Sequence, residues 1–137
     1  MITIAEYVGV HSASSDWTPS RKINAAKLLA ASTLLETRML AAGVVFHVNP
    51  KTNSQVSGET FGGFRPQNCP IGAPNSNHKI ALAWDRFDPG NEIDSWCMAN
   101  LQSLAACGIW LEHPDKTPTW SHWQCVPPRS GTRVFMP

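Results

Sequence analysis

The chain of 137 residues lacks the features of several common protein classes. Only 15% of its residues are charged, the net charge is +1, and lysine and arginine form no run, so nothing favours a nucleic-acid or anionic-membrane partner. The most apolar stretch, residues 25–42, is interrupted by Lys27, Glu36 and Arg38, which argues against a membrane span. We therefore expect a near-neutral protein with no nucleic-acid partner and no membrane span.

Targeting signals and paired cysteines are also missing. The first residues, Met1 to Glu6, contain no basic stretch followed by an apolar core, so no signal peptide is expected. Synthesis is then cytoplasmic, and action outside the cell requires release or export by another route. The four cysteines show no C-x-x-C spacing and no short Cys/His cluster, which argues against a zinc knuckle and favours reduced thiols.

Length and pattern predict a single α+β domain over residues 1–137, with no internal repeat. We expect a small antiparallel sheet with helices packed against one face, in a protein that is a monomer. Residues 1–17 have mixed character and are expected to form an extended lead-in that packs through Tyr7 or Trp17.

Two amphipathic helices are predicted. The first lies between Thr18 and Gly43, where a hydroxyl residue and a proline mark the start and apolar residues recur at helical spacing. The second begins with Asn91 as N-cap and ends at Gly108. Short β-branched or alternating runs predict strands at 44–48, 109–111 and 119–125, with an edge segment at 131–137.

The stretch Ser76 to Asp85 places an imidazole and a carboxylate seven positions apart in a run of small apolar residues. Ala81 and Ala83 share a strand face with Asp85 and are too small to fill the space beside the carboxylate, so a cavity or an ion is expected there. His78 has the opposite parity. It can face the same point as Asp85 only if it lies in a turn before the strand or if a bulge shifts the register.

The pattern Ser76-x-His78-x-x-Ala81-x-Ala83-x-Asp85 resembles the first zinc motif of the D-Ala-D-Ala metallopeptidase family, in which Gly usually occupies the place of Ala81. This family includes bacterial carboxypeptidases and phage L-alanyl-D-glutamate endolysins. Two further segments follow the family's order. Residues 62–68, Gly-Gly-Phe-Arg-Pro-Gln-Asn, are similar to its Arg-containing segment, and residues 120–124, Trp-Ser-His-Trp-Gln, are similar to its second zinc motif.

The resemblance implies a zinc centre with His78, Asp85 and His122 as ligands. Two imidazoles and one carboxylate with a fourth position open are the ligands of catalytic zinc. Taken singly, each residue could equally be an unrelated histidine or carboxylate. The resemblance also implies that Arg65 faces the substrate, where it would hydrogen-bond a carbonyl oxygen as negative charge develops or hold a substrate carboxylate.

One position departs from the family pattern. The general base is typically an acid three residues before the last histidine ligand, and here that position is Thr119, which cannot accept a proton at neutral pH. The nearest upstream acids are Glu112 and Asp115, and His113 between them is a further candidate acid or base. Glu112 follows an apolar run and is expected at the edge of a cleft with a raised pKa, so we assign it the role of base.

The sequence therefore predicts a zinc-dependent peptidase that hydrolyses peptidoglycan stem peptides, either as an endolysin or in wall remodelling. The missing acid at Thr119 keeps an alternative open: a non-catalytic, zinc-containing module that binds peptidoglycan or has a structural role in a phage. A metal-stabilised scaffold without a ligand is a third possibility.

Overall fold

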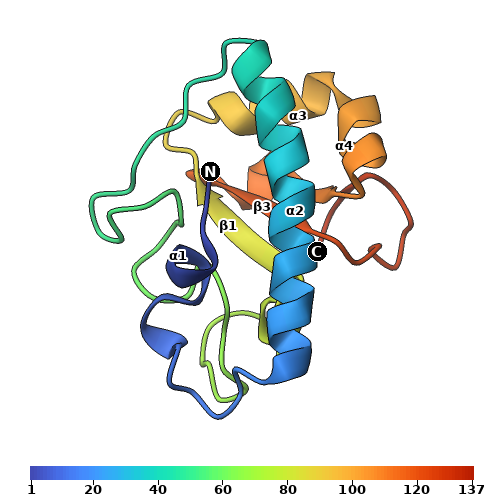
Figure 1. Cartoon of the computed structure of the whole chain (residues 1–137). Coiled ribbons are helices and arrows are strands. Elements are labelled where there is room, and N and C mark those ends of the chain that lie inside the picture. The colour runs from blue at the N-terminus through green and yellow to red at the C-terminus, as the bar shows by residue number, and fades with distance from the viewer.

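A four-stranded sheet forms the centre of the molecule in the computed structural model, which describes residues 1–137 (Figure 1). The strands are β1 (Ala83–Phe87), β2 (Trp110–Glu112), β3 (Trp120–Gln124) and β4 (Val134–Phe135). Their order is β1-β3-β2-β4. The α+β class is confirmed, but the sheet is mixed. β3 is antiparallel to β1 and β2, whereas β4 lies beyond β2 and runs parallel to it.

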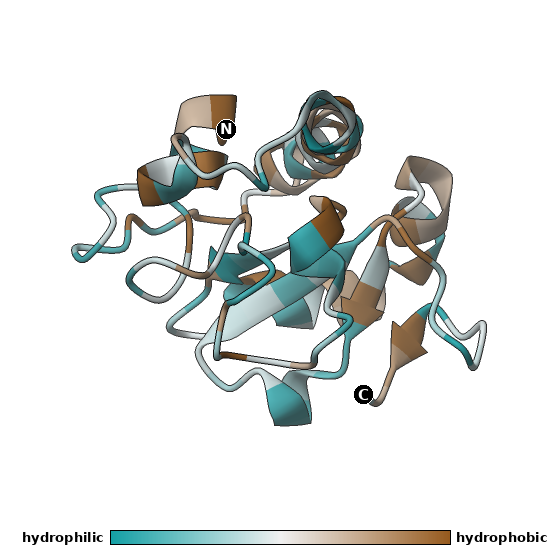
Figure 2. Ribbon diagram, turned by 90° about the horizontal axis from the view of Figure 1, so that it is seen from below, coloured by the Kyte–Doolittle hydropathy of each residue, from teal (hydrophilic) through white to brown (hydrophobic).

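Helix α2 (Pro19–Ala41) covers one face of the sheet, as the apolar pattern predicts. Leu28, Leu35 and Met39 are fully buried beneath it. Seen along its axis in Figure 2, α2 lies on the same side of the sheet as the N-terminal helix, and loops border the opposite side. The sheet therefore has one face in the core and one face available for a site.

The alternation of β1 sends neighbouring residues to opposite faces. Trp84 and Arg86 point toward α2: the Trp84 indole donates to Ser32 Oγ at 3.0 Å, and Arg86 Nη1 donates to Glu36 Oε1 at 2.6 Å. Asp85, between them, points to the other face. This strand thus connects the core with the candidate site.

The ion pair between Arg86 and Glu36 is completely buried. The Arg86 guanidinium also lies 4.1 Å from the ring centre of Phe46 and 5.2 and 5.1 Å from the ring centres of Trp84 and Trp123. Burial raises the pKa of Glu36, although the charge of Arg86 opposes that shift. The pair therefore depends on both partners, because either charge alone would be stranded among apolar side chains.

The first seventeen residues are not extended. Thr3 and Glu6 form a capping box in which Glu6 N donates to Thr3 Oγ1 at 3.2 Å and Thr3 N donates to Glu6 Oε2 at 2.7 Å. This box begins helix α1 (Ile4–Val8), and a 3₁₀ turn, η1 (Gly9–His11), follows. Tyr7 is buried, as expected.

The second predicted helix is two helices, α3 (Glu92–Ala99) and α4 (Leu101–Cys107). Asn100 separates them because its φ and ψ of −132° and 47° are not helical, and its Nδ2 donates to Trp96 O at 2.7 Å. Asn91 makes no capping bond. The Asp88 carboxylate instead accepts from the amides of Ile93 and Asp94 at 3.2 and 3.0 Å.

The strand expected at 44–48 does not form. The only β-structure in residues 42–75 consists of isolated bridges. The part of this segment from Gln55 to Gly62 forms backbone hydrogen bonds with the outer edge of β1. The amide of Ser57 donates to Asp85 O at 2.9 Å, and the amide of Asp85 donates to Gly62 O at 2.7 Å. This segment, called here the edge loop (residues 55–62), occupies the position where a further strand could have paired.

The four cysteines are free, and three of them are buried. No helix combines the length and the apolar character that crossing a bilayer requires.

Removing one member of the buried pair should be costly. We expect Glu36→Ala to lower the free energy of unfolding by about 3–5 kcal/mol, because Arg86 remains buried without its partner. Urea denaturation at neutral pH measures this change. The double variant Glu36→Leu/Arg86→Met should recover most of the loss, since no charge is left behind.

The matched control is the exposed pair of Lys51 and Glu59, whose charged atoms are 3.0 Å apart. Lys51→Ala should change the free energy of unfolding by at most about 1 kcal/mol. Equal losses in Glu36→Ala and Lys51→Ala would contradict the importance given to the buried pair.

Stability should also depend on pH through Asp94. Burial raises the pKa of Asp94 from 3.8 to about 7, and one of its oxygens has no hydrogen-bond partner. The folded protein therefore keeps this proton between these pH values while the unfolded chain loses it, so this group lowers the free energy of unfolding as pH rises through the interval. In denaturation series from pH 4.5 to 8, Asp94→Asn should gain stability relative to wild type as pH rises. Parallel curves would contradict the assignment.

Candidate metal centre

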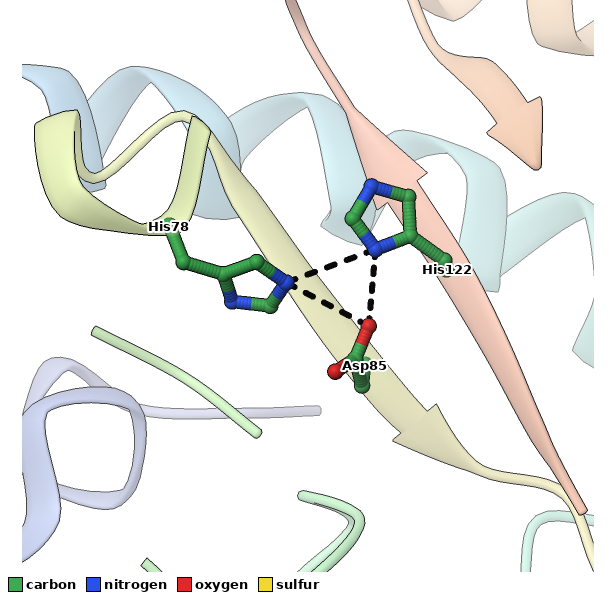
Figure 3. A group of neighbouring side chains, drawn as sticks. All are labelled: His78, Asp85 and His122. Carbon is green, nitrogen blue, oxygen red and sulfur yellow. Dashed lines mark hydrogen bonds and ion pairs between the residues drawn. The ribbon is translucent and has the colours of Figure 1, made fainter. Parts of the chain in front are cut away.

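Three buried side chains converge on the open face of the sheet (Figure 3). His122 Nδ1 lies 2.7 Å from Asp85 Oδ1, and His78 Nε2 lies 3.4 Å from the same oxygen. The two imidazole nitrogens are 3.4 Å apart. The sequence predicts these three residues as metal ligands, and the structure brings their side chains together.

The register of β1 and β3 places two of these ligands opposite each other, with Asp85 paired to His122. His78 comes from η2 (Asn77–Ile80), a 3₁₀ turn just before β1. Ala81 then adopts a left-handed conformation, with φ of 61°, and changes the chain direction. Of the two alternatives that the sequence left open, a turn or a bulge, the structure has the turn, because His78 lies before the strand.

The ring nitrogen of His78 that points away from Asp85, called here its outer nitrogen, contacts the backbone. His78 Nδ1 donates to Gly63 O at 2.7 Å. Gly63 can approach this closely because it has no side chain: a Cβ there would lie 1.9 Å from Tyr7 O, and a Cβ on Gly62 would lie 2.1 Å from Ser57 O. The Gly62-Gly63 pair thus lets the backbone reach the imidazole.

The outer nitrogen of His122 is held by Gln124, two residues along the same face of β3. His122 Nε2 donates to Gln124 Oε1 at 3.2 Å. Asn77 Nδ2 donates to the same oxygen at 3.2 Å, while Gln124 Nε2 donates to Val126 O at 2.6 Å. The orientation of the amide follows from these contacts. Strand alternation puts Gln124 on the same face as His122, but nothing in the sequence indicated a role for it.

These outer contacts decide which nitrogens are free to bind a metal. With His78 Nδ1 and His122 Nε2 both donating outward, His78 Nε2 carries a lone pair, and His122 Nδ1 gains one when a metal displaces the proton that it shares with Asp85. Histidine ligands of metals characteristically donate their second ring N–H to a carbonyl or carboxylate oxygen in this way. The arrangement therefore has the outer contacts that are characteristic of metal-binding histidines.

Arg65 holds the second oxygen of the carboxylate. Its Nη2 donates to Asp85 Oδ2 at 2.9 Å, and its Nε donates to Phe61 O at 2.6 Å. The guanidinium is buried, and the sequence did not predict this contact. Because Oδ2 is engaged by Arg65, Oδ1 is the oxygen directed at the two histidines.

The pKa values of the three side chains are shifted in different directions. Burial alone would raise the pKa of Asp85, but the charge of His78 and the hydrogen bond from His122 outweigh it and lower that pKa, so the carboxylate is ionised. Burial lowers the pKa of His78, although the charge of Asp85 opposes that shift. Burial also acts to lower the pKa of His122, but its hydrogen bond to Asp85 outweighs this and raises the pKa.

The donor set fits zinc. Tetrahedral zinc with ligands at 2.0–2.2 Å requires neighbouring donor atoms about 3.3 Å apart. Two of the three separations are 3.4 Å. The third, at 2.7 Å between His122 and Asp85, is shorter because a hydrogen bond joins the two atoms. Two neutral imidazoles and one carboxylate are ligands that zinc takes in its catalytic sites.

A cleft of about 460 Å³, called here the metal cleft, opens over the three ligands. Among its other lining residues are Arg65, Glu112, Trp120 and Gln124. Glu112 is half-buried at the end of β2, and burial raises its pKa. Asp115 does not line this cleft and is largely exposed. Of the two acids considered from the sequence, the structure thus places only Glu112 beside the three candidate ligands.

Comparison with known proteins identifies no relative: no protein-family model, curated protein or solved structure matches this chain.

The metal assignment predicts a graded loss of affinity. His78→Ala should abolish stoichiometric zinc binding after dialysis, whereas His47→Ala should leave it intact, because His47 instead contacts Glu92 at 2.9 Å. Gln124→Leu should weaken zinc affinity by about 10–100-fold, because His122 loses its outer partner. Metal analysis and competition with a chromogenic chelator measure both quantities. Full zinc occupancy in His78→Ala would contradict the assignment.

Proposed function

We propose that this protein is a zinc-dependent peptidase that hydrolyses the stem peptides of peptidoglycan. The observation that carries the proposal is the buried set of His78, Asp85 and His122, in which both histidines donate their outer N–H to a carbonyl oxygen and direct their inner nitrogens at one point. A zinc ion at such a site supplies a Lewis acid that polarises a carbonyl group and lowers the pKa of water.

The chain supplies the proton transfers through Glu112. A base must accept a proton from the attacking water, and an acid must then donate one to the leaving amine. Glu112 lines the cleft that holds the three ligands, and the raised pKa that follows from its burial suits both tasks. In this proposal Glu112 takes the role of the acid absent at Thr119.

In this proposal Arg65 acts chiefly by holding Asp85, one of the three proposed zinc ligands. The sequence pattern favoured direct contact with substrate, and the guanidinium does line the cleft. Its contact with Asp85, however, gives it a second task, which is to fix the carboxylate so that one oxygen remains directed at the histidines. A buried guanidinium also balances the charge of Asp85.

The substrate class rests on the sequence resemblance. The three motif segments, around Arg65, His78 and His122, follow the order of a family that acts on peptidoglycan, and the structure brings residues of all three into one cleft. Action on the wall follows release or export. The alternative of a non-catalytic wall-binding module is favoured by one observation, the threonine at position 119.

Hydrolysis of synthetic stem peptides by the zinc-loaded protein, followed by mass spectrometry, tests the proposal. We expect cleavage that is lost on chelation and restored by zinc. Glu112→Gln should keep the fold and the zinc but lower turnover by about 100-fold or more, because the shape is preserved and the basicity is lost.

Asp115→Asn is the matched control, since Asp115 is exposed and outside the cleft, and it should retain the wild-type rate. An inactive Asp115→Asn beside an active Glu112→Gln would move the role of base to Asp115. Complete absence of cleavage by the zinc-loaded wild type, together with retention on purified peptidoglycan, would favour the non-catalytic module.

A further inference from the structure

We infer that the enzyme cuts internal peptide bonds, with the substrate continuing from the metal cleft into a second cleft on the far side of Arg65 and Asp85. This inference rests on the proposed function and selects endopeptidase over carboxypeptidase action. It follows from the arrangement of the two adjoining clefts and from the charged residues that line them.

The second cleft has a volume of about 400 Å³, similar to that of the metal cleft. Both volumes are within the range of sites that hold small ligands. The two clefts share four lining residues, namely Arg65, Ile71, Asp85 and Trp120. The ion pair of Arg65 and Asp85 therefore lies at the junction between two spaces and does not close the end of a single one.

The edge loop forms the wall of the second cleft. Phe61, Ile71 and Trp120 provide its apolar surface, and Ser57 and Thr60 add hydroxyl groups. Gly58 and Gly62 contribute no side chains, and Gly58 has a φ of 75°, which glycine adopts without strain. The space is thus suited to short apolar side chains and peptide groups of an extended segment.

Neither cleft offers a free cation for a terminal carboxylate. An enzyme that removes the last residue of a peptide must recognise that carboxylate, for which a fixed arginine or lysine is the usual partner. Arg65 is the sole lysine or arginine that lines either cleft, and it is paired with Asp85 at 2.9 Å. The metal cleft instead includes the carboxylate of Glu112. A chain end with a negative charge is therefore disfavoured.

The position of Glu112 sets the direction of the substrate. Glu112 lines the metal cleft and is absent from the second cleft. The leaving amine receives its proton from this residue, so the part of the substrate beyond the amine lies in the metal cleft. The acyl part, on the N-terminal side of the broken bond, then extends across Arg65 into the second cleft.

Three substrates test the inference: a synthetic stem pentapeptide with a free carboxyl terminus, its C-terminal amide, and a form extended by two residues at that end. We expect kcat/KM for the amide and the extended form to be within a few-fold of that for the free acid. A carboxypeptidase would discriminate against both by about 100-fold or more, because its carboxylate contact would be lost. That result would overturn the inference while leaving the peptidase proposal intact.

A second measurement addresses the cleft itself. Thr60→Trp should reduce its volume and lower kcat/KM for N-terminally extended peptides at least 10-fold more than for N-terminally truncated ones. Lys22→Trp, an exposed change on α2, controls for an added indole and should leave this ratio unchanged. Equal losses on long and short peptides in Thr60→Trp would contradict the role of the second cleft. If no peptide is cut by the wild type, the proposed function fails before this inference is reached.

Discussion

The candidate site depends on the register in which β1 pairs with β3. Asp85 lies opposite His122 and Arg86 lies opposite Ser121, so one face of the pair carries the ligands and the other carries core residues. A slip of one residue would send Asp85 into the apolar layer beneath α2 and Arg86 to the cleft. The buried contacts of Trp84 with Ser32 and of Arg86 with Glu36 oppose such a slip. The core therefore fixes the geometry of the candidate metal ligands.

Much of this arrangement could be predicted because it depends on local patterns. The helical spacing of α2, the alternation of β3 and the turn around His78 are all properties of short segments. The three candidate ligands could be selected because their spacing resembles known motifs, and the structure brings them together. In contrast, the strand predicted at 44–48 is wrong, although its composition is typical of a strand, because the edge loop occupies the edge of β1 where a strand could pair.

Most of the contacts that the sequence did not predict join distant residues or involve the backbone. The pairing of Arg65 with Asp85 spans 20 positions, and that of His78 with Gly63 spans 15. Gln124 lies near His122 in sequence, but its role depends on Asn77 and Val126, which fix the direction of its amide. Periodicity can assign a side chain to a face, yet it does not determine which atom that side chain presents. Tertiary packing supplies that information.

The edge loop also affects how molecules of this protein meet one another. β1 is the outermost strand on its side, and an unprotected strand edge can pair with the edge of another chain. Here the loop already bonds that edge, through Ser57, Gly62 and the amide of Phe87, which donates to Gln55 O at 2.7 Å. At the opposite edge, β4 has only two residues. The segment that borders the second cleft therefore also protects the sheet against edge-to-edge aggregation.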